Sequence, residues 1–215
     1  MGCDIHLYVE VKENGEWKGV LNPANTNDYV YDHDNDEEIA VPGYSWSFGR
    51  NYFAFGILAG VRSSLECIYP ECIYPKRGLP SDICQQIKLF SDMYGPDGHT
   101  HSYLSLSELK TIIDANQSII YAVDYENYKL FKNGYDDFQS VPSWIAKQYT
   151  CITNEQMDLY LEHYAFSNNE KFLTYVKVSP STTSRDYKEE LRELYNYILF
   201  LFKGKEARIV FWFDN

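Results

Sequence analysis

Two polar residues near the beginning of the sequence, Asp4 and His6, have types and a spacing that could support chemistry. The apolar residues Ile5 and Leu7 alternate with them, and neighbouring side chains along a strand point to opposite faces. The pattern therefore predicts a strand that carries Asp4 and His6 on one face, roughly 7 Å apart. A carboxylate beside an imidazole can transfer a proton, bind a metal ion or hydrogen-bond a polar ligand.

A second group of such residues lies in a glycine-containing segment, where Asp97, His99 and His101 follow one another at every second position. On an extended loop their side chains would lie on one side, and with His6 they offer the three or four ligands that zinc prefers. The spacing is short and generic, so two other interpretations stay open. In one, His6 and His99 hydrogen-bond to carboxylates or backbone and order the loops. In the other, they contact a ligand without a metal.

Three arginines lie in segments that contain glycine or proline, and not on solvated helix faces: Arg50, Arg62 and Arg77. Asn51 is a suitable N-cap, which places Arg50 beside the unpaired N–H groups of a helical first turn. A guanidinium and a helix N-terminus both favour an anion, so Arg50 is the first candidate for binding phosphate. Arg62 either binds the same anion or forms a structural ion pair with Asp4 or Asp97.

The expected secondary structure indicates how these residues would be positioned. The Asn14-Gly15 pair predicts a tight turn between the first strand and a second near 17–21. Helices are predicted from Asn51, over about 81–93, after Ser105, over about 153–164 and over about 184–203. Residues 207–215 form a nearly continuous apolar run, which predicts a buried central strand beside the first one. These elements predict an α+β fold with a single mixed sheet that includes both terminal strands, in one domain spanning 1–215.

The charge of the chain argues against some partners. The 215 residues carry a formal net charge of −12, so the phosphate backbone of duplex DNA or RNA should repel the protein. A small anion is still a suitable ligand, because two or three placed arginines suffice to bind it. The acidic residues are concentrated over 28–38, a segment that is predicted to be a solvated loop.

The remaining composition indicates where the protein acts. No positive segment followed by an apolar run opens the sequence, and no apolar stretch approaches roughly 20 residues. Neither a signal peptide nor a membrane span is therefore expected, and the five cysteines are expected to be free thiols in the cytoplasm. The 20 tyrosines and 12 phenylalanines predict a core and pockets with aromatic walls.

Several discontinuous blocks, which together cover about a third of the chain, form a recognisable pattern. The blocks are Gly2–His6, Gly49–Tyr52, Ala59–Arg62, Arg77–Pro80, Asp97–His99, Ser102–Leu104 and Phe211–Asn215. Together they resemble a family of small uncharacterised proteins from tailed phages and their bacterial hosts, which begin Met-Gly-Cys-Asp-Ile-His. The resemblance implies a protein of the host cytoplasm where the gene belongs to a phage, and it implies no particular activity.

Two functions of different classes follow as hypotheses. In the first, the protein binds a small anionic, nucleotide-like molecule without a cofactor and sequesters it. A second messenger of host immunity, sequestered in a counter-defence role, is one such molecule. In the second, it is a metal-dependent hydrolase that acts on a phosphoester or nucleotide. The expected ligand-binding residues are Asp4, His6, Arg50, Asn51, Tyr52, Arg62, Arg77, Asp97, His99 and Ser102. The alternative uses His6, His99, His101 and Asp97 as ligands of a divalent metal, and the oligomeric state is left open.

Overall fold

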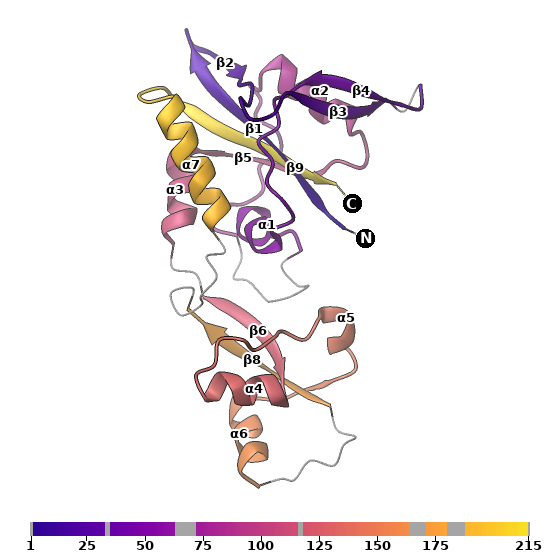
Figure 1. Cartoon of the computed structure of the whole chain (residues 1–215), viewed down its shortest axis with the longest axis vertical. Coiled ribbons are helices and arrows are strands. Elements are labelled where there is room, and N and C mark those ends of the chain that lie inside the picture. The colour runs from indigo at the N-terminus through magenta and orange to yellow at the C-terminus, as the bar shows by residue number, and fades with distance from the viewer. Residues whose placement is uncertain are drawn as a thin grey trace. The chain divides into compact units, whose positions relative to one another are not determined.

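A computed structural model describes residues 2–32, 35–62, 72–115, 118–163, 171–179 and 188–214. Contacts between Cα atoms group the chain into two compact units (Figure 1). Unit 1 comprises 1–61, 73–114 and 188–215, and unit 2 comprises 62–72 and 115–187. The expectation of one domain stays a prediction, because contacts alone do not tell whether the two units unfold together.

Unit 1 is built on a four-stranded antiparallel sheet in the order β2-β1-β9-β5. Its strands are β1 (Asp4–Glu13), β2 (Glu16–Gly19), β5 (His99–Ser105) and β9 (Ala207–Asp214). The predicted pairing of the two terminal strands is confirmed, with Asp4 opposite Asp214 and Val11 opposite Ala207. The continuous apolar run of β9 is explained by its central position, since it pairs with β1 on one side and β5 on the other. The α+β fold with both terminal strands in one sheet is thus as predicted. That sheet is antiparallel rather than mixed, however, and the described residues form two further sheets besides it.

Helices cover the sheet because both of its faces are apolar. Tyr8, Val210 and Trp212 form a cluster with Ile87 and Phe90 of α2 (Gln85–Met93). The opposite face carries the buried residues Ile5, Leu7, Phe211 and Phe213. Phe213 contacts Phe55 of α1 (Tyr52–Ala59), with ring centroids 5.2 Å apart. Helix α3 (Leu106–Asp114) contacts β9 and also packs against α7 (Glu189–Leu201) (Figure 1).

The acidic segment 28–38 is not the plain solvated loop that its composition predicts. It lies in a hairpin formed by β3 (Asn27–Asp32) and β4 (Glu37–Pro42). Asp28 accepts hydrogen bonds from the backbone N–H groups of Tyr44 (2.8 Å) and Ser45 (2.6 Å), so its carboxylate organises the chain beyond the hairpin. The prediction was wrong because so many charged residues hide the alternation of Tyr29, Ile39 and Val41.

Capping boxes define the first turns of α3 and α6 (Asn154–His163), as the sequence predicts. The Ser105 N–H donates to Glu108 Oε2 (2.9 Å), and the Glu108 N–H donates to Ser105 Oγ (3.2 Å). Thr153 and Gln156 make the same reciprocal pair for α6. Glu108 also accepts two hydrogen bonds from the guanidinium of Arg77, at 2.6 and 3.1 Å. One carboxylate therefore joins the start of α3 to the segment before α2.

The Arg77–Glu108 pair should make stability depend on pH. Hydrogen bonding from Arg77 lowers the pKa of Glu108 from its ordinary value of 4.5. Because the folded-state pKa is depressed, the stabilisation is fully present above pH 4.5 and is lost as pH falls through the folded-state pKa. Glu108→Gln keeps an acceptor for the capping box but removes the charge. We expect it to cost about 1 kcal/mol at neutral pH, reduced by partial solvent screening.

Urea unfolding of wild type and Glu108→Gln between pH 7 and pH 3 checks this prediction. The two stabilities should converge as the solution is acidified. A difference that stays constant over the whole range would show that the charge on Glu108 contributes nothing to the fold.

Unit 2 contains a three-stranded sheet in the order β6-β8-β7. Its strands are β6 (Ile119–Asp124), β7 (Thr150–Cys151) and β8 (Phe172–Val178), and its helices are α4 (Tyr125–Lys132), α5 (Ser143–Ala146) and α6. The core consists of Val123, Tyr128, Met157, Val176 and Val178. No helix among the described residues of either unit is long and apolar enough to cross a membrane.

Candidate functional site

The candidate site lies at the end of the unit 1 sheet where β1 begins and β9 ends. Cross-strand pairing places Asp4 opposite Asp214 and His6 opposite Trp212. All four side chains belong to the same face, because each strand alternates with a period of two. The alternation that predicted Asp4 and His6 as neighbours is therefore matched by a second pair from the other end of the chain.

Two carboxylates stand directly opposite each other at this site, an arrangement that is destabilising unless cations neutralise it. Arg50 donates to both oxygens of Asp4, from Nε and Nη2, each at 2.7 Å. These hydrogen bonds lower the pKa of Asp4, so it stays ionised. His6 Nε2 lies 3.1 Å from Asp214 Oδ2, at ion-pair distance, but it is not oriented for a hydrogen bond. Each carboxylate thus has its own basic neighbour.

Aromatic rings stack beneath this polar cluster. Trp212 is fully buried and stacks on Tyr8 (4.9 Å between centroids), His101 (5.6 Å) and His6 (6.0 Å). Tyr94 covers His6 with centroids 4.1 Å apart. Burial, followed by the nearby charge of Asp214, raises the pKa of Tyr94 to about 12, so its hydroxyl stays neutral. The imidazole of His6 is therefore held between two aromatic side chains.

Three buried ring nitrogens at this end of the sheet have no hydrogen-bond partner among the described residues: His6 Nε2, His99 Nε2 and Trp212 Nε1. The indole N–H of Trp212 can only donate, so its missing partner must be an acceptor. Leaving a buried donor unsatisfied costs about 1–3 kcal/mol. An oxygen atom, from an ordered water or from a ligand, would remove that cost.

The histidines of 97–101 do not share a side, contrary to the expectation for an extended loop. A bulge interrupts the β5–β9 pairing between His99 and Ser102, and Thr100 has a φ of 55°. This bulge breaks the alternation of side chains. His99 consequently stacks on Phe213, whereas His101 stacks on Trp212, the preceding residue of β9. His101 Nε2 also lies 2.9 Å from Ser91 Oγ, and burial lowers the pKa of His101.

The segment around Arg50 precedes α1 as expected, but the guanidinium of Arg50 does not point to the N-terminus of that helix. Asn51 caps α1 through its side-chain oxygen, which accepts from the Ala54 N–H at 3.1 Å. Asn51 also donates to Glu190 Oε2 at 2.7 Å, and the ring of Tyr52 packs against α1 itself. Arg50 turns toward Asp4 instead of the first turn of α1, because a carboxylate is a stronger partner than the helix dipole.

The remaining predicted ligand residues lie apart from this cluster or have other partners. Arg77 is engaged by Glu108 and stacks over the ring of Tyr103 at 5.3 Å. Ser102 is buried in the middle of β5, and Asp97 is exposed in the turn after α2. Arg62, with a φ of 58°, is grouped with unit 2. The structure therefore brings together Asp4, His6 and Arg50, with His99 at the same end of the sheet.

Among the described residues, no group of three or more His, Cys, Asp or Glu side chains is placed to bind a metal ion. The bulge at Thr100 turns His99 and His101 toward different residues of β9. The four ligands of the alternative metal site, His6, His99, His101 and Asp97, therefore do not all lie on one side. A metal bound by these four residues stays an untested alternative.

Sequence reasoning missed two members of the site. They are Asp214 and Tyr94, neither of which is among the predicted site residues. A signal for Asp214 was present: pairing the terminal strands in the observed register places the last acidic residue of β9 opposite Asp4. No local pattern could have indicated Tyr94, since its position depends on how α2 packs on the sheet.

Comparison of the chain with protein-family models, with curated proteins and with solved structures finds no match.

Proposed function

We propose that the protein binds a small anionic, nucleotide-like molecule at the Asp4–Arg50 end of the unit 1 sheet and releases it chemically unchanged. One observation supports this most strongly: an exposed guanidinium lies at the same sheet end as a buried indole N–H without an acceptor. Arg50 is 57% exposed, and Trp212 Nε1 has no partner among the described residues. Both groups can only donate hydrogen bonds, so both favour a ligand rich in oxygen acceptors.

The geometry suggests a role for each residue. The Asp4 contacts use two of the five N–H donors of Arg50 and fix the orientation of its guanidinium. The other donors suit a phosphate or carboxylate. The ring of Tyr94, which covers the imidazole of His6, offers a flat surface against which a base could stack. Asp214 Oδ2, which lies 3.1 Å from His6 Nε2, would help to keep that imidazole in place.

The resemblance to phage proteins makes nucleotide second messengers of host immunity, such as cyclic oligonucleotides, the first ligands to test. The protein is incubated with a nucleotide panel, separated from free nucleotide and denatured by heat, and the released molecules are identified by mass spectrometry. Recovery of an intact nucleotide in stoichiometric amount is the expected result. Failure to retain any member of a panel that covers linear, cyclic and ADP-ribose nucleotides would refute the proposal.

A second candidate is hydrolysis of a phosphoester or nucleotide. The specific observation in its favour is the 3.1 Å approach of His6 Nε2 to Asp214 Oδ2, because a carboxylate beside an imidazole supports a general base. The same incubation distinguishes the two functions. Conversion of the nucleotide that stops in His6→Ala favours hydrolysis, and loss of that conversion with a chelator favours the metal-dependent form.

A further inference from the structure

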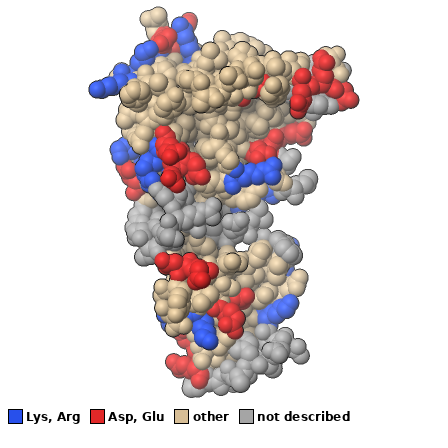
Figure 2. Space-filling view, in the orientation of Figure 1, with Lys and Arg blue, Asp and Glu red and all other residues tan. Residues whose placement is uncertain are grey.

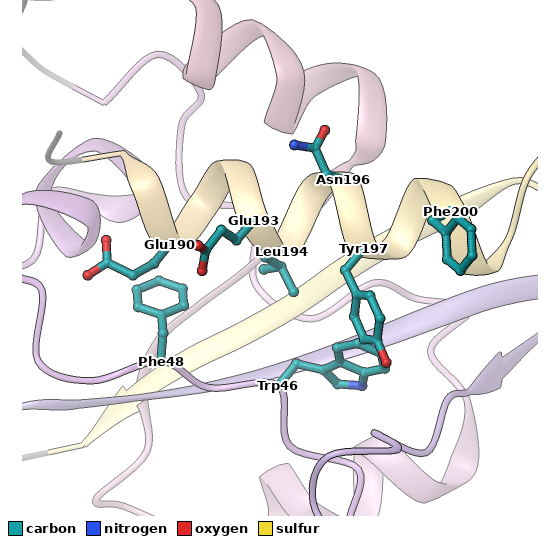
Figure 3. A pocket seen from close by; sticks show the side chains of 8 residues that line it. All are labelled: Trp46, Phe48, Glu190, Glu193, Leu194, Asn196, Tyr197 and Phe200. Atoms are coloured by element: carbon teal, nitrogen blue, oxygen red, sulfur yellow. The ribbon is translucent and has the colours of Figure 1, made fainter.

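An aromatic hollow of about 650 Å³ lies on unit 1, between α7 and the segment that carries Trp46 and Phe48 (Figure 3). Leu194 forms its floor, and the rings of Trp46 and Tyr197 face each other with centroids 5.6 Å apart. Asp4, His6 and Arg50 do not line this hollow. It is therefore a surface that the proposed function does not use.

Helix α7 carries two apolar stripes, only one of which is covered. Leu191, Leu194 and Ile198 are buried against the rest of unit 1. Tyr197, Phe200 and Leu201 follow helical spacing on a second stripe and are 40%, 79% and 37% exposed. Phe200 exposes about four-fifths of its surface to water, which is unfavourable for a large aromatic side chain. Exposed aromatic patches of this kind mark interaction sites. We therefore expect a partner molecule to cover the second stripe.

The charges beside this stripe favour a partner with a particular layout. Glu190 and Glu193 line the hollow near the start of α7, whereas Lys203 is exposed just after its last turn. Figure 2 shows acidic side chains with basic ones beside them near the start of α7, and uncharged surface over its later turns. The surface thus runs from acidic through aromatic to basic. An antiparallel copy of the same surface presents these three parts in the complementary order.

We propose that two copies of the chain associate through α7 in antiparallel orientation about a two-fold axis near Tyr197. Placing Phe200 of one copy in the hollow at Leu194 of the other brings Lys203 opposite Glu190. The same register brings Tyr197 opposite itself. The Phe200–Leu194 and Lys203–Glu190 contacts each occur twice, as an isologous interface requires. The aromatic side chains supply most of the affinity, and the Glu190–Lys203 contacts fix the direction of the helices.

The net charge of −12 on each copy opposes association. Salt screens this repulsion beyond about 8 Å at physiological ionic strength, whereas burial of aromatic area acts at contact. The dimer should accordingly form at moderate salt and should not require low ionic strength.

Sedimentation velocity of the full chain, from low micromolar to several hundred micromolar, tests the proposal. Wild type should pass from monomer to dimer over this range. Phe200→Ala should raise the dimer dissociation constant at least about thirtyfold, because it removes a central aromatic anchor. Leu199→Ala is the matched control, since Leu199 is 46% exposed on the same helix but lies outside the stripe. It should dimerise like wild type, and thermal melts of both variants should show intact folds.

A charge exchange tests the direction of the helices. Lys203→Glu should weaken the dimer, and adding Glu190→Lys in the same chain should restore it, because both contacts regain opposite charges. A wild-type chain that stays monomeric throughout the range would overturn the proposal. So would a Phe200→Ala variant that dimerises as well as Leu199→Ala.

Discussion

Arg208→Ala should destabilise the protein by about 3–5 kcal/mol, because it leaves a buried carboxylate without its cation. Glu10 is fully buried in β1, and Arg208 Nε donates to its Oε2. The other oxygen of Glu10 accepts the backbone N–H of Cys84 at 2.6 Å. Arg208 also donates to Asp82 Oδ1 at 2.7 Å, and its guanidinium lies 3.9 Å from the ring centroid of Trp17. This network joins the two central strands to the segment before α2.

The expected loss is a large part of the total stability of about 5–15 kcal/mol that a protein of this kind has. Denaturant unfolding measures it. Lys205→Ala is the matched control, because Lys205 also pairs with a β1 carboxylate, Glu13, but at an exposed position. That change should have little effect. The double variant Glu10→Met/Arg208→Met should lose less stability than Arg208→Ala, since it removes both charges together. If Arg208→Ala costs no more than Lys205→Ala, the buried network does not hold the sheet together.

Arg50→Ala should weaken binding of the retained nucleotide by roughly tenfold or more, because it removes charge-assisted hydrogen bonds to the anion. The effect is smaller than for a fully desolvated charge pair, since Arg50 is more than half exposed. Isothermal titration provides the affinities. Arg77→Ala is the control, because Arg77 is engaged by Glu108 and should not contact the ligand. It should leave the affinity within about twofold of wild type, well under the 1.4 kcal/mol that corresponds to a factor of ten.

A second variant distinguishes contact with the ligand from charge compensation. Removing Arg50 also leaves Asp4 and Asp214 opposite each other without a guanidinium, and two carboxylates would repel any anion. Arg50→Ala/Asp4→Asn removes that repulsion. If Arg50 contacts the ligand, the double variant still binds weakly. Recovery of wild-type affinity would instead assign Arg50 the role of neutralising Asp4.

Much of unit 1 could be predicted because its signals are local. Alternation in β1, the continuous apolar run of β9 and the two capping boxes each occupy a few consecutive residues. The central pairing of β1 with β9 followed because both strands need a common core. The hairpin over 27–42 could not be predicted, since its apolar residues are too few among the charges.

The candidate site was only partly predictable, because its geometry depends on distant residues and on one irregularity. His6 meets Asp214 through strand register, and Arg50 meets Asp4 through the path of the chain before α1. The bulge at Thr100 separates His99 from His101, and a positive φ at a threonine leaves no clear signal in a single sequence. The second stripe of α7 could not be predicted, because helical spacing alone does not tell which of two apolar stripes a helix buries.

The indole N–H signals of ¹⁵N-labelled protein test most directly whether the ligand supplies the acceptor that the Trp212 N–H lacks. The chain has four tryptophans, so the signals can be assigned with single Trp→Phe variants. Trp46 provides an internal control, because it lines the hollow on α7 rather than this site. On titration with the retained nucleotide, the Trp212 signal should shift and saturate as its N–H gains an acceptor, while the Trp46 signal stays in place. A shift at Trp46 with none at Trp212 would contradict the account.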